Sequence, residues 1–170
     1  MIRKHKKFSR PRKPFDITRI KNENEIVKKY GLKNKREIWK AKEKLDNIRR
    51  RAKLLINESN DEEQRQFLDK LNNLGYKAEK VVDVLALTEE DVLGRRLQTI
   101  IVKKGICTTP KGARQLITHK HILVDGKIVN SPSYHVGIEE ENKINKIQKV
   151  KKAILTNKET ETPVEQEVVA

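Results

Sequence analysis

Basic side chains with a spacing suited to phosphate binding gather in residues 93–138. This segment carries eight Lys or Arg residues and one acidic residue. Lys111 and Arg114 are three positions apart, so on a helix they would project from one face and could contact adjacent phosphates. We predict a phosphate-binding platform formed by Arg95, Arg96, Lys111, Arg114, His119, Lys120, His121 and Lys127.

The distribution of charge along the chain supports a polyanionic partner. The 170 residues carry a net charge of +15. Residues 1–55 hold 21 basic and 6 acidic side chains, whereas residues 56–92 hold 4 basic and 10 acidic ones. Charge that served only solubility would be mixed more evenly than this. Two basic blocks separated by an acidic segment therefore indicate binding to a phosphate backbone.

The first fourteen residues contain seven Lys or Arg residues and no acid. A stretch without a core-forming apolar pattern is expected to be an extended arm that orders on a polyanion. A mobile terminus with incidental charge is the alternative interpretation. The residues of this arm that we predict to contact phosphates of the polyanion are Arg3, Lys4, Lys6, Lys7, Arg10 and Arg12.

Residues 15–92 are predicted to form a helical domain. Between Asn34 and Ile56 the apolar residues recur at spacings of three and four, as in an amphipathic helix. The stripe consists of Ile38, Ala41, Leu45, Ile48, Ala52 and Leu55. Asn34 is expected to cap this helix, with Glu37 completing a capping box. The opposite face is basic, and the nearby arm of the same sign favours phosphate contact by Arg49, Arg50 and Arg51 over a merely solvated face.

An acidic helix is predicted from Asp61 to Leu74, with an apolar side and with Gly75 in the left-handed position that ends helices. Its acidic first turn complements the helix dipole, so this helix is expected to serve packing. Residues 81–87 form another short helical piece in this prediction. Trp39 lies beside the apolar stripe, where packing is a simpler role than base stacking.

Residues 93–138 are predicted to form a small domain of two helices and an antiparallel sheet. Thr88 and Asp91 have capping-box spacing before one helix that continues to Gly105. Thr109-Pro110 fits the start of a second helix. The pair Asp125-Gly126 between two short apolar runs predicts a hairpin, because both turn positions need positive φ. A third strand is expected to start at residues 134–136.

The fold class is therefore α+β. Residues 1–14 are the extended basic arm, 15–92 the helical domain and 93–138 the inserted small domain. Residues 139–155 are predicted to return to the helical and sheet body, and residues 156–170 to form a disordered acidic tail. The chain has no run of 18 apolar residues, which excludes a membrane-spanning helix. The single cysteine, Cys107, excludes an intramolecular disulfide and a cysteine zinc cluster.

Two parts of the sequence resemble known proteins. The run ARQLITHKHILVDGKIVNSPSYHV (residues 113–136), with the preceding GRRLQTIIVKKG and TPKGARQ, resembles the RNA-binding domain named after ribosomal protein S4. KHKKFSRPRKPFD and YGLKNKREIWKAKEKLDNIRRRAKLL resemble the archaeal and eukaryotic branch of that ribosomal protein family. Together the matches cover most of residues 3–140. Asp125 departs from the usual Asn, and Gly112 is unusual inside a short helix, where it costs about 1 kcal/mol relative to Ala.

The resemblance implies a structural protein of the small ribosomal subunit that is cytoplasmic and bound to the ribosome. It implies direct binding of small-subunit ribosomal RNA at a multi-helix junction, early in assembly. It also implies a position near the mRNA entry site, beside ribosomal proteins S3 and S5, and a contribution to translational accuracy. The RNA-facing residues that it implies in the small domain are Arg95, Arg96, Lys111, Arg114, His119, Lys120 and Lys127.

Other functions are less well supported by the residues. The same small domain occurs in pseudouridine synthases and tRNA synthetases, but those need a separate catalytic domain. We therefore predict no enzyme activity, no cofactor and no small-molecule substrate. His119 and His121 are two positions apart without a nearby carboxylate cluster, so no metal site is expected. An RNA chaperone that acts outside the ribosome remains an alternative that composition does not separate from a ribosomal protein.

Overall fold

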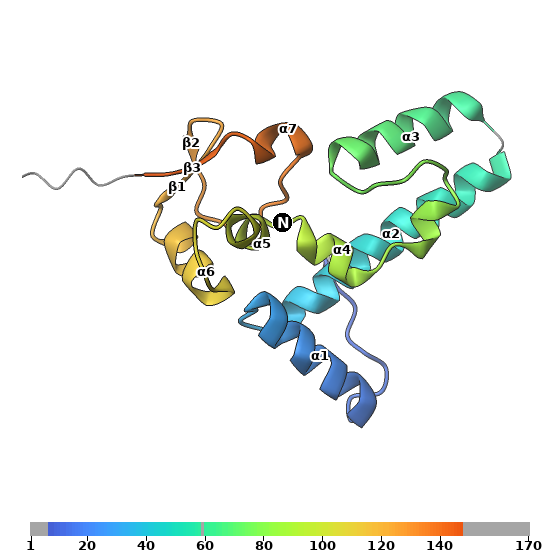
Figure 1. Cartoon of the computed structure of the whole chain (residues 1–170). Coiled ribbons are helices and arrows are strands. Elements are labelled where there is room, and N and C mark those ends of the chain that lie inside the picture. The colour runs from blue at the N-terminus through green and yellow to red at the C-terminus, as the bar shows by residue number, and fades with distance from the viewer. Residues whose placement is uncertain (1–6, 59, 148–170) are drawn as a thin grey trace, which may run out of the picture.

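A computed structural model describes residues 7–58 and 60–147. Two hydrophobic cores lie in this part of the chain. The first contains buried residues from Leu32 to Leu93, and the second contains buried residues from Leu97 to Ile144. We call the residues around the second core the small domain. In Figure 1 it lies on one side of the long helix α2, and α1 and α3 lie on other sides of the same helix.

The first helix, α1 (Ile17–Tyr30), was not predicted from the sequence. The Asp16 side chain caps it by accepting hydrogen bonds from the backbone N–H groups of Thr18 (3.1 Å) and Arg19 (3.4 Å). Gly31 ends it in the left-handed conformation, with a φ of 58°. Asp before the helix and Gly after it are ordinary cap signals, and together they could have revealed α1.

The helix α2 (Arg36–Glu58) confirms the amphipathic prediction. Five members of the predicted stripe are buried, and the sixth, Ile48, is partly buried against the same core. The Asn34 side chain accepts a hydrogen bond from the backbone N–H of Arg36 at 3.1 Å, so it caps the helix. Glu37 does not bond to the Asn34 N–H as the predicted capping box requires. Its carboxylate accepts from the backbone N–H of Lys33 at 3.4 Å and binds two arginines of the small domain.

The acidic helix α3 (Asp61–Asn73) packs on α2 with Phe67 and Leu71 buried, which confirms the packing role predicted for its apolar side (Figure 1). The short 3-10 helix η1 (Asp83–Ala86) and the helix α4 (Glu89–Gly94) complete the first core. The predicted capping box of Thr88 and Asp91 is confirmed, since the Asp91 carboxylate accepts from the Thr88 backbone N–H at 2.8 Å. Local sequence signals therefore suffice for these elements.

The single helix predicted from residue 88 to Gly105 is instead two helices. α4 ends at Gly94, and α5 (Leu97–Lys103) begins after an extended Arg96 with φ −76° and ψ 145°. Arg96 forms an isolated β-bridge with His135, and the Leu97 backbone N–H donates to the Tyr134 carbonyl at 2.8 Å. These contacts with a distant loop interrupt a pattern that reads as continuous in the sequence.

The rest of the small domain is the helix α6 (Pro110–Thr118) and a three-stranded antiparallel sheet. The strands β1 (Ile122–Val124), β2 (Lys127–Ile128) and β3 (Ile144–Lys146) lie in the order β2-β1-β3. The Asp125-Gly126 turn has positive φ at both positions, as predicted. The third strand of the sheet is β3, so the prediction that this strand starts at residues 134–136 is wrong. The short helix α7 (Ile138–Glu141) lies between residues 134–136 and β3 in the chain.

These elements confirm the α+β class. The division between the two cores falls between Leu93 and Leu97, close to the expected start of the small domain. The second core extends to Ile144, beyond the expected end at residue 138, because β3 pairs with β1. Residues 1–6 of the arm, residues 148–155 of the return segment and the acidic tail lie outside the described residues.

Candidate nucleic-acid interface

The two ends of α6 and the hairpin turn present several exposed basic side chains of the small domain. Lys111, Lys120 and Lys127 are exposed, as is His119. None of these lysines has an ion pair within the described part of the chain. Lys120 has a φ of 61°, so the chain turns sharply where α6 ends, before His121. Their exposure is compatible with the predicted phosphate contacts, which stay predictions.

The described part of the basic arm lies against the helical domain. The Phe8 ring is 6.1 Å from the Trp39 ring, between centroids. The Arg19 guanidinium donates to the backbone carbonyls of Lys13 (3.0 Å) and Pro14 (2.9 Å). Lys7, Arg10 and Arg12 are exposed, and Arg3, Lys4 and Lys6 lie outside the described residues. These contacts fix where the arm leaves the helical domain.

On α2 the three consecutive arginines have different surroundings. Arg50 and Arg51 are exposed, and the Arg51 guanidinium carbon lies 5.8 Å from the centre of the Phe67 ring. Arg49 is half-buried and donates to the Leu87 carbonyl oxygen at 2.6 Å. Arg49 therefore ties α2 to the segment before α4, whereas its two neighbours can contact RNA.

Arg95 also has protein partners. It donates to the Glu141 carboxylate at 2.7 Å and to the Val136 carbonyl oxygen at 3.1 Å. A Cβ at Gly75 would lie 2.4 Å from Arg95 Nε, so the guanidinium lies directly over this glycine. Arg95 thereby joins the end of α3 to α7. Its fixed position differs from that of a side chain that is free to find a phosphate.

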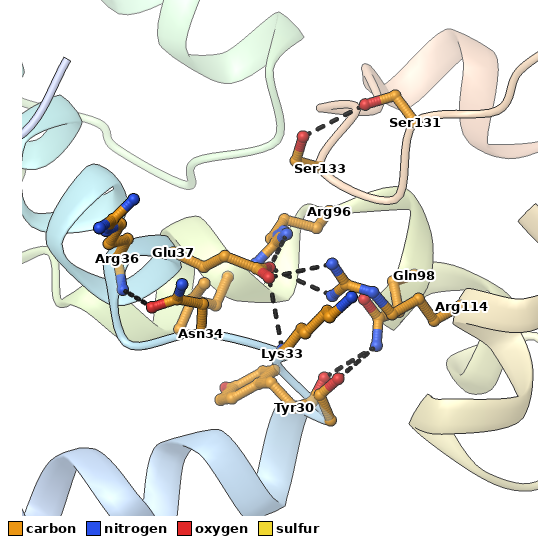
Figure 2. A network of polar contacts seen from close by, with 12 residues as sticks. Tyr30, Lys33, Asn34, Arg36, Glu37, Arg96, Gln98, Arg114, Ser131 and Ser133 are labelled. Carbon is orange, nitrogen blue, oxygen red and sulfur yellow. Dashed lines mark hydrogen bonds and ion pairs between the residues drawn. The ribbon is translucent and has the colours of Figure 1, made fainter. Parts of the chain in front are cut away.

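Arg96 and Arg114 converge on one carboxylate, that of Glu37 (Figure 2). Arg96 Nη2 lies 2.6 Å from Glu37 Oε2, and Arg114 donates to both oxygens, at 3.0 and 3.3 Å. Burial opposes the charged form of Glu37, but the hydrogen bonds from Arg114 and Arg96 outweigh burial and lower its pKa below the usual value. Sequence reasoning missed this role because Arg96 and Arg114 are 59 and 77 residues away.

A cavity of about 1060 Å³ opens beside this cluster, between α2 and the loop that follows β2. Lys40 and Lys44 line it from the helical domain, and Ser133 and His135 line it from the small domain. Burial lowers the pKa of the Lys44 ammonium. Cations of one domain therefore face polar groups of the other across a shared hollow.

His135 lies in the wall of this cavity. Its Nε2 is 2.6 Å from the Tyr76 hydroxyl oxygen. Burial lowers the pKa of His135 to about 4, with further lowering by Lys44 and Arg95. The imidazole is consequently neutral near pH 7 and serves as a polar link between the domains rather than as a cation for RNA.

Other chemistry has little basis in the described residues. Among them, no group of three or more His, Cys, Asp or Glu side chains is placed to hold a metal ion. Of the helices in residues 7–58 and 60–147, none combines the length and apolar character needed to cross a membrane.

Gly112, which is unusual inside a short helix, has a structural explanation, because a Cβ there would lie 2.8 Å from the Cys107 sulfur.

Comparison with known proteins assigns the small domain to a family. The S4 domain family matches residues 95–142, which span α5, α6, both strands of the hairpin and α7. The match therefore covers Lys111, His119, Lys120 and Lys127.

Curated relatives match most of the chain. The small ribosomal subunit protein uS4 of Methanothermobacter thermautotrophicus is 46% identical over 144 residues, which cover 82% of this chain and 84% of the relative. The uS4 proteins of Nanoarchaeum equitans and Methanococcus aeolicus are 44% and 43% identical. They cover 85% and 82% of this chain, and 84% and 82% of their own lengths. The chain belongs to the uS4 family of small ribosomal subunit proteins.

Family membership confirms several predictions from the sequence. The chain belongs to the family that its small domain and its N-terminal half both resemble in sequence. The prediction that the chain is not an enzyme is confirmed, because the family is structural. The individual RNA-binding residues are not tested by these comparisons and stay predictions.

Proposed function

We propose that this protein is a structural component of the small ribosomal subunit that binds small-subunit ribosomal RNA directly, at a junction of several RNA helices. Its membership of the uS4 family supports a place in the cytoplasmic ribosome. The observation that carries direct RNA binding is the set of exposed cations on both domains that have no ion pair within the described residues. The cations that we propose to contact phosphates are Lys7, Arg10, Arg12, Arg50, Arg51, Lys111, Lys120 and Lys127, together with the exposed imidazole of His119.

Phosphate and sugar contacts are expected to dominate over base stacking. Only 4% of the residues are aromatic, and Trp39 donates its indole N–H to Glu23 rather than facing solvent freely. Folded RNA is recognised mainly through its shape and backbone, whereas single strands need aromatic platforms. The charge and the shortage of aromatic residues thus favour folded ribosomal RNA as the ligand.

The four partly buried arginines have a second role in this proposal. Arg49, Arg95, Arg96 and Arg114 each donate to a protein carbonyl or carboxylate. Of the two arginines that bind Glu37, Arg114 is the more accessible, with 26% of its side chain exposed, so it can also face RNA. The other three are proposed to hold the surface in shape.

Salt titration of the affinity for a small-subunit RNA junction fragment tests direct binding. Each phosphate contact contributes a slope of about −0.9 to a plot of log affinity against log salt concentration. K111A, K120A and K127A are each expected to flatten the slope by about one contact. K70A, an exposed lysine on the acidic helix α3, is the matched control and should change neither affinity nor slope. Equal slopes for all four variants would contradict the proposed surface.

The finer proposals rest on the resemblance to the ribosomal S4 family. We propose that the protein joins the RNA early in subunit assembly and lies near the mRNA entry site beside ribosomal proteins S3 and S5. There it contributes to translational accuracy. Order-of-addition reconstitution tests the timing, and crosslinking to S3 and S5 tests the location. A reporter of misreading tests the effect on accuracy in cells that carry K111A or K127A.

A further inference from the structure

We propose that Glu37 is a positioning residue for RNA binding, which fixes the small domain against the helical domain so that cations of both bind one RNA together. This inference rests on the proposed function, because it concerns how the RNA surface is held in shape. Glu37 comes from the first turn of α2, Arg96 from the N-cap of α5 and Arg114 from the middle of α6. One carboxylate thus joins three elements of two domains.

The geometry of this cluster is specific. Arg114 donates to both Glu37 oxygens, which is the paired arrangement that guanidinium and carboxylate groups favour. Arg96 donates to Oε2 from a position where only 8% of the residue is exposed. Removal of one partner from such a pair destabilises the fold, because the other charge would remain buried without compensation. Glu37 therefore determines where both arginines lie.

A second contact fixes the same boundary. The side-chain nitrogen of Gln98, a residue only 1% exposed, lies 2.8 to 3.2 Å from the carbonyl oxygens of Tyr30, Gly31 and Pro110 (Figure 2 shows Gln98 and Tyr30). A Cβ at Gly31 would lie 2.7 Å from the Pro110 Cβ. The turn after α1 therefore packs directly on the start of α6, with no room for a side chain between them.

The Glu37 cluster fixes the spacing between cations of the two domains, and RNA binding depends on this spacing. The cavity beside Glu37 is lined by Lys40 and Lys44 from one domain and by Ser133 and His135 from the other. Without the Glu37 carboxylate, two guanidiniums that now share it would repel each other across the boundary. The domains would then separate or rotate, and cations on the two sides would no longer match one fixed arrangement of phosphates.

The sign of the effect distinguishes positioning from simple electrostatics. Glu43 lines the same cavity and has no ion pair among the described residues. Removal of a carboxylate close to RNA raises affinity when nothing else changes, because repulsion between negative charges is lost. E43Q is therefore expected to bind a junction RNA as tightly as the unmodified chain or more tightly. E37Q, with the same change of charge, is expected to bind at least about tenfold more weakly.

The experiment measures affinities of the full chain, E37Q and E43Q for two RNAs. One is a small-subunit junction fragment that spans both domains, and the other is a short RNA duplex that a single domain can contact. E37Q should lose affinity for the junction and keep it for the duplex. Equal or tighter junction binding by E37Q would overturn the positioning role. If the unmodified chain binds neither RNA, the proposed function itself fails instead.

A second variant covers the case in which E37Q does not fold. Q98L removes the Gln98 hydrogen bonds to the helical domain without any change of charge. It is expected to show the same selective loss of junction affinity, with circular dichroism unchanged. Binding of both RNAs by Q98L as tightly as by the unmodified chain would overturn the proposal.

Discussion

Two carboxylates of low exposure, Glu23 and Glu37, use the same chemistry in different regions of the molecule. Glu23 is 7% exposed and accepts from Arg19 at 2.7 Å and from the Trp39 indole N–H at 3.1 Å, with the Lys35 ammonium at 3.3 Å. All of its partners belong to α1, α2 and the turn between them. Glu37 binds arginines of the small domain. One carboxylate stabilises a domain from within, and the other holds two domains together.

The comparison shows why net charge alone describes this protein poorly. A basic chain needs a few carboxylates at points where Lys or Arg side chains stabilise the fold and do not contact RNA. Burial opposes the charged form of Glu23, yet the hydrogen bonds from Trp39, Arg19 and Lys35 lower its pKa below the usual value. Both carboxylates stay charged near neutral pH, and each removes cations from the pool available to phosphates.

The largest effect is expected from removing the two carboxylates in turn. E37A should lower the free energy of unfolding by about 3 kcal/mol, because it leaves Arg96 buried without its partner. E23A should cost about 1 to 2 kcal/mol, because Arg19 and Lys35 can reach solvent. Urea unfolding monitored by circular dichroism measures both values. A larger loss for E23A than for E37A would reverse the comparison.

A smaller effect is expected from two glycines with similar backbone conformations. G31A should destabilise the protein by about 2 kcal/mol or more, since φ is +58° and the new Cβ would collide with Pro110. G105A has a φ of +72° but open space around the Cβ, so backbone strain alone should cost about 1 kcal/mol. Thermal unfolding of the two variants compares them. Equal losses would mean that the contact between the domains contributes nothing.

The smallest effect near pH 7 is that of His135 at the boundary between the domains, and it grows only as the solution becomes acidic. The pKa of His135 is lowered to about 4 by burial and by Lys44 and Arg95, whereas an unfolded histidine has a pKa of about 6.5. Between these two pH values His135 is mostly protonated in the unfolded chain and mostly neutral in the folded chain. Stability should therefore fall as the pH drops from about 6.5 to about 4.

The variant H135Q isolates this contribution, because an amide can still pair with the Tyr76 hydroxyl but does not titrate. Its free energy of unfolding should change less with pH across this window than that of the unmodified chain. Chemical denaturation at pH 7, 6 and 5 provides the measurement. Parallel curves for the two proteins would show that His135 does not lose its proton on folding.

Local patterns in the sequence predicted much of the fold. The stripe of α2, the capping box of Thr88 and Asp91, the start of α6 at Thr109-Pro110 and the Asp125-Gly126 turn all depend on residues close together in the chain. Such features follow from periodicity and backbone preferences alone. Two of the errors have another cause, whereas α1 was missed despite the local cap signals of Asp16 and Gly31. The break at Arg96 and the position of β3 depend on contacts with residues about 20 to 40 positions away.

The candidate site was predictable in composition but not in arrangement. Sequence alone located the basic segments and named Lys111, Lys120 and Lys127, which are exposed. It did not separate Arg96, which binds Glu37, from Lys111, which is exposed, because both are simply basic in a basic segment. Burial and distant partners decide that difference, and neither leaves a local signal.

Sedimentation of a cell extract on a sucrose gradient, before and after a high-salt wash, distinguishes a component of the small ribosomal subunit from a transient factor. We expect the protein to sediment with the small subunit and to stay there through the wash, because many phosphate contacts act together with fixed domains. Sedimentation at the top of the gradient, or release from the subunit at modest salt, would show that the protein is not a structural component of the subunit. It would then be an RNA-binding factor that visits the ribosome.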